Sequence, residues 1–304
     1  MVVADSAEAA REKVAAARLS VISNVLLVAL KLVIGIQIGS VAVLSEAIHS
    51  GTDLVAAMIS FFAVRAAGAP PDDDHPYGHG KLESLSCMAE ALLIVTAGVL
   101  IVYEAMVAIE RSNETPGFGW GMVTMIFSAV TNVLVARRLF TVARRTDSVA
   151  LAADGQHLMI DVGTSVGVVV GLGAVALTGW RWLDPIVALI VAVFVFLTGW
   201  RIAAGATRLL LDTRLPDSEV QRIKAILDED NRVLSWHKLR TRKAGWQRHV
   251  DVHVQVDDDM SLKAAHQLTE ELEDRMRAAL PNVEVIIHTE PYEEEMRHHQ
   301  ETPH

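Results

Sequence analysis

The sequence predicts an α-helical membrane protein with six transmembrane helices and a C-terminal cytoplasmic ferredoxin-like α/β domain. Two observations favour this class over a soluble enzyme: 51% of the 304 residues are hydrophobic, and the mean hydropathy is +0.32. A third is that residues 16–210 consist of long apolar runs, whereas residues 211–292 change to the shorter periods of a small α/β domain. We therefore expect a cytoplasmic N-terminal segment at 1–15 and a disordered tail at 293–304.

Six apolar runs are long enough to cross a bilayer, which takes about 20 apolar residues in a helix. They cover roughly residues 16–37, 41–65, 84–109, 118–137, 151–178 and 182–205. The N-terminus has charged residues but no short apolar core followed by a small-residue cleavage site. No signal peptide is therefore expected, and the first helix should remain in place.

The orientation follows from the lysines and arginines that flank these helices, because short cytoplasmic loops carry an excess of them. One side has many: Arg11, Lys13, Arg18, Arg65, Lys81, Arg137, Arg138, Arg144 and Arg145, the last four assigned to the fourth loop. The loops of the opposite side have only Arg111 and Arg181. This asymmetry predicts that both termini are cytoplasmic. The expected location is the bacterial inner (cell) membrane, with the protein integral to it.

The C-terminal domain is predicted from its changing periodicity. We expect a helix at 216–229, a strand at 234–242, a helix from Ser261 to Ala279 and a last strand at Val283–His288. Between the first strand and the second helix, HVDVHVQV alternates as a half-buried strand does, with His249, Asp251 and His253 on the polar face. The order α-β-β-α-β with antiparallel neighbours indicates a ferredoxin-like two-layer sandwich.

Two copies of His-x-x-x-Asp, His49/Asp53 and His157/Asp161, lie inside membrane-spanning runs. A four-residue step returns to the same helix face, so each pair can direct an imidazole and a carboxylate at one point. Polar groups at that depth are costly unless they face a partner or a cavity. The alternative is that these residues only hydrogen-bond to neighbouring helices, but two copies favour a tetrahedral N2O2 site suited to Zn2+.

Two further groups of residues have the composition of metal sites. In the loop PPDDDHPYGHGKLES, Asp72, His75 and His79 lie in a turn rich in proline and glycine. The alternative is a solvated acidic loop that attracts cations without a defined site. The C-terminal domain has several histidines and a carboxylate, which in the alternative view are exposed titratable groups: His237, His253, His266, His288 and Glu290.

The chain resembles the cation diffusion facilitator family from about residue 16 to 292, through SEAIHSGTD, HPYGHGKLES, DGQHLMIDV, LLLDTRLP, HKLRTR and VIIHTEP in that order. The resemblance implies a homodimer in the lipid bilayer that exchanges a divalent cation for protons. It assigns the transport site to His49, Asp53, His157 and Asp161, a loop site to Asp72, His75 and His79, and a cytoplasmic, often binuclear, site to His237, His253, His266, His288 and Glu290. It also implies a salt bridge between Lys81 and Asp212.

Two positions depart from the pattern of the family. His49 stands where several bacterial zinc and iron exporters have aspartate, and the resulting set is associated with zinc-preferring members. Glu290 stands where an aspartate is common. Zn2+ is therefore the expected substrate and bound ion, although Cd2+, Co2+, Ni2+ and Fe2+ accept similar ligands.

These features predict a secondary active transporter that removes metal from the cytosol by alternating access. Metal and protons would compete for the imidazole nitrogens, because a protonated histidine has no lone pair to offer. Two other classes are weighed against it, a membrane-anchored metal sensor and a metalloenzyme. The sequence has no H-E-x-x-H or similar motif, and a sensor has no need of a site inside the membrane. No enzymatic activity and no nucleic-acid partner are expected.

Overall fold

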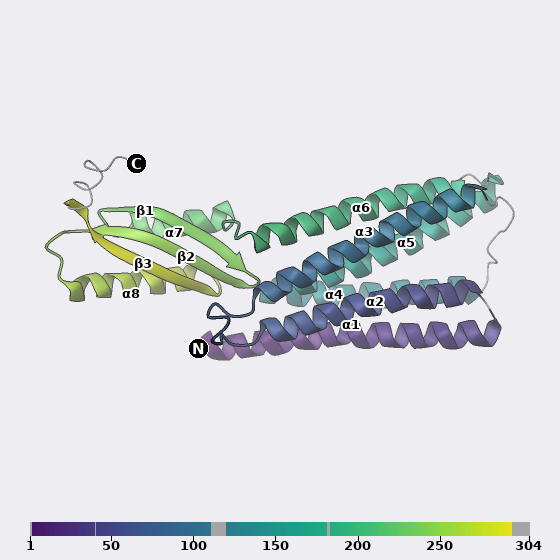
Figure 1. The fold of residues 1–304 in the computed structure, drawn as a ribbon, viewed down its shortest axis with the longest axis horizontal. Coiled ribbons are helices and arrows are strands. Elements are labelled where there is room, and N and C mark those ends of the chain that lie inside the picture. The colour runs from purple at the N-terminus through teal and green to yellow at the C-terminus, as the bar shows by residue number, and fades with distance from the viewer. Residues whose placement is uncertain (1, 40, 111–119, 181–182, 294–304) are drawn as a thin grey trace. The chain divides into compact units, whose positions relative to one another are not determined.

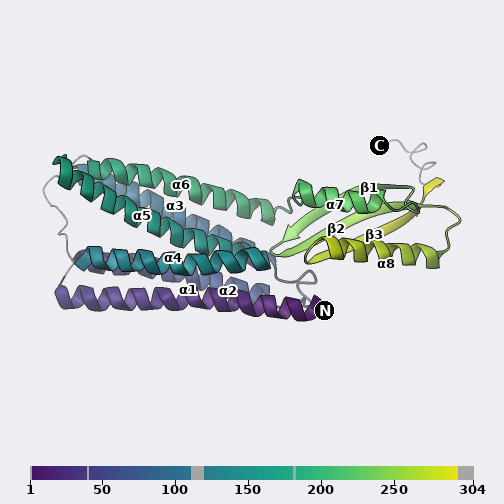
Figure 2. The same ribbon diagram turned by 180° about the vertical axis from the view of Figure 1, so that it is seen from behind.

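The computed structural model describes residues 2–39, 41–110, 120–180 and 183–293. The chain divides into two compact units, Met1–Thr207 and Arg208–His304. The first contains long helices (Figures 1 and 2), which are α1 (Val2–Ile38), α2 (Val41–Ala67), α3 (Lys81–Glu110), α4 (Trp120–Thr146), α5 (Val149–Thr178) and α6 (Leu183–Leu210).

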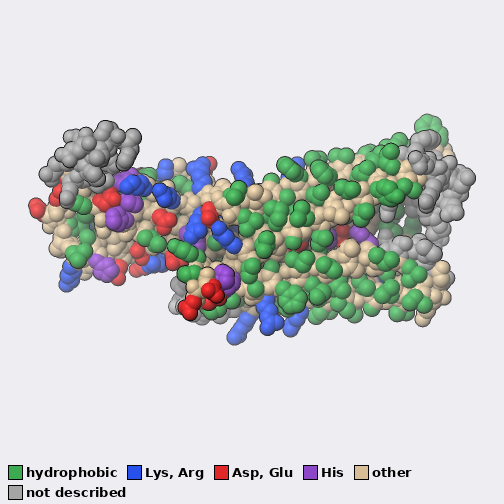
Figure 3. All heavy atoms as spheres, viewed as in Figure 1, with side chains coloured by type: hydrophobic (Ala, Val, Ile, Leu, Met, Phe, Trp, Pro, Cys, Tyr) green, Lys and Arg blue, Asp and Glu red, His purple; other side chains and the backbone are tan. Residues whose placement is uncertain are grey.

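The surface of the helical unit is strongly apolar, as Figure 3 shows. Large side chains such as Leu26, Phe62 and Ile190 are more than half exposed. Contiguous apolar surface of this kind marks contact with lipid or protein rather than water. Five helices have described stretches long and apolar enough to cross a membrane: Glu8–Gln37, Ala47–Ala67, Lys81–Val107, Met122–Thr146 and Ile186–Leu210. The expectation of a helical transmembrane domain is therefore confirmed.

Helix α5 lies between two packed groups of helices. Its Leu151 and Leu158 belong to a buried cluster with residues of α1, α2 and α4, including Val64 and Leu139. Another residue of α5, Ile160, belongs to a second buried cluster, with residues of α3 and α6. The His157/Asp161 pair therefore lies on a helix that is packed on both sides, and any shift of α5 changes its contacts with five neighbouring helices.

Two helices extend beyond the predicted membrane-crossing runs. Helix α1 begins at Val2, before the run predicted from residue 16, because its first turns are rich in alanine, glutamate, arginine and lysine, which are strong helix formers. Helix α4 continues to Thr146, so the four arginines assigned to a loop lie on it. The helix continues because Leu139 and Val142 recur on its buried face. The connection to α5 is then only Asp147, with φ 54°, and the N-cap Ser148. Arg111 and Arg181 lie outside the described residues.

The second unit is a small α/β domain, as predicted. Its elements are α7 (Asp217–Asp228), β1 (Ser235–Ala244), β2 (Gln247–Val256), α8 (Leu262–Ala279) and β3 (Val283–Pro291). The apolar faces of α7 and α8 share one core with the valines of β2, so both helices cover the same face of the sheet. Helix α8 begins at Ser261, whose hydroxyl accepts from the backbone N–H of Ala264. Of the predicted disordered tail, all but Glu293 lies outside the described residues.

The sheet has the order β1-β2-β3, with β2 in the centre. Strand β2 is antiparallel to β1 but parallel to β3, so the expectation of antiparallel neighbours holds for only one pair. The crossover helix α8 explains the difference, since it returns the chain to the end of the sheet at which β2 began. The central position also explains why His249, expected on the polar face, is only 5% exposed.

Candidate metal sites

The two His-x-x-x-Asp pairs of α2 and α5 converge. Ligand atoms of His49, Asp53 and Asp161 lie within 4.8 Å of one another. His157 Nε2 is 3.4 Å from Asp53 Oδ1 and 3.9 Å from Asp161 Oδ2. Asp53 and His157 are buried, whereas His49 is exposed. The structure thus brings all four predicted residues into one group, here called the membrane cage, with two nitrogen and two carboxylate ligands.

Several ligand atoms of the membrane cage have unmet bonding capacity. Asp53 Oδ1, Asp161 Oδ2 and both ring nitrogens of His157 are buried with no hydrogen-bond partner among the described residues. Buried polar atoms are nearly always bonded, so a group of unbonded ones requires an explanation. A cation at their centre would meet the need of all of them at once, and imidazole with carboxylate is a donor set that suits a divalent transition metal.

A buried lysine beside the membrane cage is not anticipated by the sequence reasoning. Lys31 of α1 is 4% exposed, and its ammonium donates to Ser50 Oγ at 2.8 Å, next to His49 in the chain. It also interacts electrostatically with Asp161. The signal in the sequence is a single lysine inside an otherwise apolar run, VLLVALKLVIGI. An intramembrane charge of this kind marks a functional position by default.

A second buried network, built on Glu83 at the start of α3, fixes the start of α5. Glu83 is fully buried, and its Oε1 accepts from the Lys13 ammonium of α1 at 2.9 Å. Its Oε2 accepts from Ser148 Oγ at 2.7 Å and from the backbone N–H of Val149 at 3.1 Å. A carboxylate at a helix N-terminus is favoured by the helix dipole. Glu83 therefore holds together α1, α3 and helix α5, which carries His157 and Asp161.

The predicted loop residues Asp72, His75 and His79 also form a group with ligand atoms within 4.8 Å of one another. Asp72 Oδ1 accepts from the backbone N–H of His75 at 2.6 Å, and its Oδ2 is 3.3 Å from His79 Nε2. Partial burial acts to raise the pKa of Asp72, but the hydrogen bonds from His75 and the charges of both histidines lower it overall. The carboxylate is thus kept ionised, as a metal ligand must be.

In the cytoplasmic domain, three predicted histidines form a row across the sheet. The strand register places His237 of β1 opposite His253 of β2, which in turn lies beside His288 of β3. Glu290 of β3 binds the row, with its carboxylate oxygens 3.3 Å from His237 Nε2, 2.5 Å from His253 Nδ1 and 3.6 Å from His288 Nε2. Ligand atoms of His237, His253 and Glu290 lie within 4.8 Å of one another.

The surroundings of this histidine row support metal binding. Burial acts to raise the pKa of Glu290, but its hydrogen bond to His253 and the nearby positive groups lower it. Next to His237 the β1–β2 register shifts, and Lys238 has φ 51°. Such bulges re-aim side chains beside functional sites.

His266 is not part of the group: it lies on α8, is exposed and contacts Glu270 at 3.5 Å. Asp212 lies 3.5 Å from Arg242, and its predicted pairing with Lys81 stays a prediction.

Comparisons with known proteins agree with this arrangement. The sequence model of the cation efflux transmembrane domain matches residues 17–211, and that of the cation efflux protein cytoplasmic domain matches residues 215–292. The chain belongs to the cation efflux, or cation diffusion facilitator, family. It is therefore an integral membrane protein that exports divalent metal cations and not an enzyme. The cytoplasmic domain of the family also indicates dimerisation and interaction with metal ions.

Relatives in the cation efflux family match most of the chain. An uncharacterized transporter of Synechocystis is 35% identical over 257 residues, which is 84% of this chain and 83% of the relative. The cation-efflux pump FieF of Shewanella oneidensis is 31% identical over 280 residues, or 92% and 94%. Among solved structures, the metal-bound C-terminal domain of the CzcD transporter from Thermotoga maritima is 31% identical, covers 25% of this chain and 94% of its own, and has a TM-score of 0.24.

Proposed function

We propose that this member of the family exports Zn2+ from the cytosol in exchange for protons, with the metal ion bound as substrate in the membrane cage. The observation that carries the proposal is the convergence of His49, Asp53, His157 and Asp161, several of whose buried ligand atoms have no hydrogen-bond partner among the described residues. Two nitrogens and two oxygens suit tetrahedral Zn2+. Cd2+, Co2+, Ni2+ and Fe2+ are expected to compete.

Proton exchange follows from the chemistry of these ligands. With neutral histidines and ionised aspartates the empty cage carries two negative charges, and the ammonium of Lys31 places one positive charge beside them. When Zn2+ leaves, this negative charge is no longer balanced by the metal. Protons then bind the same nitrogen and oxygen atoms, because metal and protons compete for the lone pairs. A proton gradient directed inward would drive metal outward if the cage opens alternately to each side.

The loop group and the histidine row are proposed as auxiliary sites on the cytoplasmic side of a homodimer in the bacterial inner membrane, with both termini in the cytosol. Support comes from the basic residues of α4, such as Arg144 and Arg145, which lie in its last turn. Metal bound at the histidine row of His237, His253 and His288 could regulate transport only through a different affinity for the two conformations of the protein.

Zinc uptake into proteoliposomes that carry a pH gradient and a fluorescent zinc reporter tests the proposal. His49→Ala, Asp53→Ala, His157→Ala and Asp161→Ala should each abolish exchange, because the three remaining ligands do not complete the tetrahedron. The matched control is Gln156→Ala, an exposed residue adjacent to His157, which should transport normally. Near-normal exchange in any two of the four variants, or zinc uptake that ignores the pH gradient, would contradict the proposal.

A further inference from the structure

Besides Glu83, two buried carboxylates of the described residues lie near the membrane cage but outside it, Glu90 on α3 and Asp154 on α5, with exposures of 0% and 1%. Helices α3 and α5 pack together at this level, since the next residue of α3, Ala91, and Ala153 of α5 belong to the same buried cluster. Asp154 precedes His157 by about one helical turn, or roughly 4.5 Å along the axis, on the side of the α4–α5 turn. Glu90 interacts electrostatically with both Asp154 and His157.

The bonding of these carboxylates is incomplete. Glu90 Oε2 and Asp154 Oδ2 are buried without a hydrogen-bond partner within the described residues. Glu90 Oε1 accepts one long hydrogen bond, from Ser86 Oγ at 3.4 Å. Neither oxygen atom is compensated by an arginine or lysine in the way that Glu83 is compensated by Lys13. A buried pair of carboxylates is very unfavourable unless protons or a cation neutralise it.

Two buried serines adjoin these carboxylates. Ser60 of α2 interacts with Glu90, and Ser20 of α1 interacts with Asp154. Both serines are 0% exposed, and neither hydroxyl makes a well-formed hydrogen bond with a described residue. Oxygen atoms from four helices therefore surround a region in which Glu90 Oε2 and Asp154 Oδ2 keep no hydrogen-bond partner among the described residues.

We propose that Glu90 and Asp154, with the hydroxyls of Ser20 and Ser60, form a second cation-binding position through which the exported ion passes on its way to the membrane cage. This inference rests on the proposed function. The two carboxylates match the charge of a divalent cation. Because all the donors are oxygen, the position binds Zn2+ less tightly than the nitrogen-containing cage and discriminates little among divalent ions. An ion therefore moves on to the cage, where selection occurs.

Direct binding measurements on the full chain test this second position. In a background in which His79→Ala and His253→Ala disable the loop group and the histidine row, equilibrium dialysis with Zn2+ and with Mn2+ counts the ions bound per chain. We expect one tightly bound and one weakly bound ion. Asp161→Ala should remove the tight ion, and Glu90→Gln combined with Asp154→Asn should remove the weak one. Glu8→Gln, at an exposed position of α1, should remove neither.

Transport by the Glu90→Gln/Asp154→Asn variant supplies the second readout. The initial rate of zinc uptake should fall about tenfold or more, because the ion loses a group that it contacts before it reaches the cage. The Kd of the tight ion should change less than about threefold, because the four residues of the cage are unchanged. Retention of the tight ion also shows that the variant is folded. One bound ion in the background protein, or a weak ion that persists in the double variant, would overturn the proposal. Because binding is counted without transport, failure of zinc/proton exchange would not be confused with failure of the second position.

Discussion

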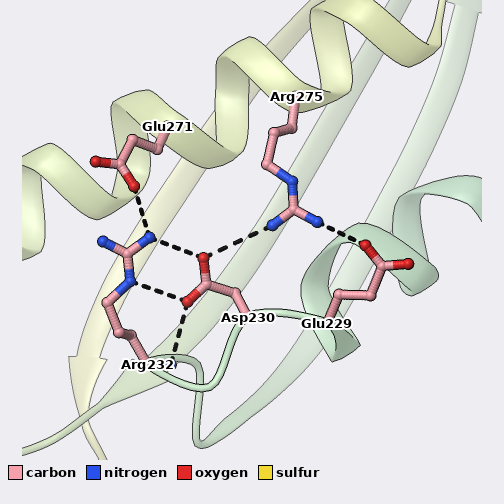
Figure 4. Close-up of polar contacts among 5 residues, drawn as sticks. All are labelled: Glu229, Asp230, Arg232, Glu271 and Arg275. Atoms are coloured by element: carbon pink, nitrogen blue, oxygen red, sulfur yellow. Dashed lines mark hydrogen bonds and ion pairs between the residues drawn. The ribbon is translucent and has the colours of Figure 1, made fainter.

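The ion network around Asp230 gives a stability prediction that can be worked out in numbers. Figure 4 shows Asp230, which follows the C-cap residue Glu229 of α7, between Arg232 and Arg275. Arg232 donates to both carboxylate oxygens at 2.9 and 2.8 Å, and Arg275 approaches at 3.6 Å. The arginines continue to Glu271 at 2.6 Å and to Glu229 at 2.8 Å. The network joins α7 to α8, the two helices that back the sheet with the histidine row.

Hydrogen bonds from Arg232 lower the pKa of Asp230 from its usual 3.8 to about 2, against the opposing effect of burial, with a smaller contribution from Arg275. At about 1.36 kcal/mol per unit, this difference corresponds to about 2.4 kcal/mol of stability at neutral pH. Solvent and salt screen a network at the domain surface, so we expect about 1 to 2 kcal/mol. The folded-state pKa is the lower one, so the contribution is present above about pH 4 and is lost as the pH falls through about 2.

The perturbation is Asp230→Asn in the fragment 212–293, which has its own hydrophobic core. Urea unfolding followed by circular dichroism, with chelator present, should show the variant less stable at pH 7, and the gap should close between about pH 4 and pH 2. The matched control is Asp274→Asn, because Asp274 pairs with Arg277 at 3.0 Å but is 79% exposed; it should cost less than about 0.5 kcal/mol. A gap that stays constant with pH, or one equal to that of the control, would refute this reasoning.

Three further predictions concern metal. His49→Asp should raise Cd2+, Fe2+ and Mn2+ transport relative to Zn2+, because an NO3 set is harder and more anionic; an unchanged ratio in the proteoliposome assay would count against His49 as a ligand. Lys31→Met should tighten Zn2+ binding about tenfold and slow turnover, since it removes a positive charge near Asp161; equal Kd and rate would exclude that role. Calorimetry on fragment 212–293 should detect Zn2+ binding that weakens below about pH 6.5. His253→Ala should abolish this binding while His266→Ala retains most of it, and the reverse order would disprove the grouping.

Periodicity predicted the parts of the fold in which one stretch of sequence determines its own structure. The four-residue step of His49 and Asp53 needs only a helix, and the alternating valines of β2 need only one buried face. The bundle and the α/β domain followed from such local patterns. Boundaries were less predictable where two signals conflict, as in α4, where four arginines suggested a loop but Leu139 and Val142 continue the buried face of a helix.

Features that depend on pairing between distant segments could not be derived from periodicity. The row of His237, His253 and His288 requires the register of three strands, and the parallel pairing of β2 with β3 requires the path of α8. The resemblance to a family supplied the histidines but included His266, which the fold places on the exposed side of α8. The contact of Glu83 with Ser148 joins residues far apart in the chain, and no spacing rule indicates it.

The buried charges of the helical unit fall into two kinds, and under the proposed transport this difference would let one bundle be both stable and permeable to a cation. Glu83 has a permanent partner in Lys13 and additional donors at the start of α5, so it joins helices whether or not metal is bound. Asp53, Asp161, Glu90 and Asp154 instead keep buried oxygen atoms that have no hydrogen-bond partner among the described residues. Breaking the first kind removes a structural contact and leaves an uncompensated buried charge. The second kind is costly in the empty protein, and under the proposed transport a passing divalent cation would relieve that cost.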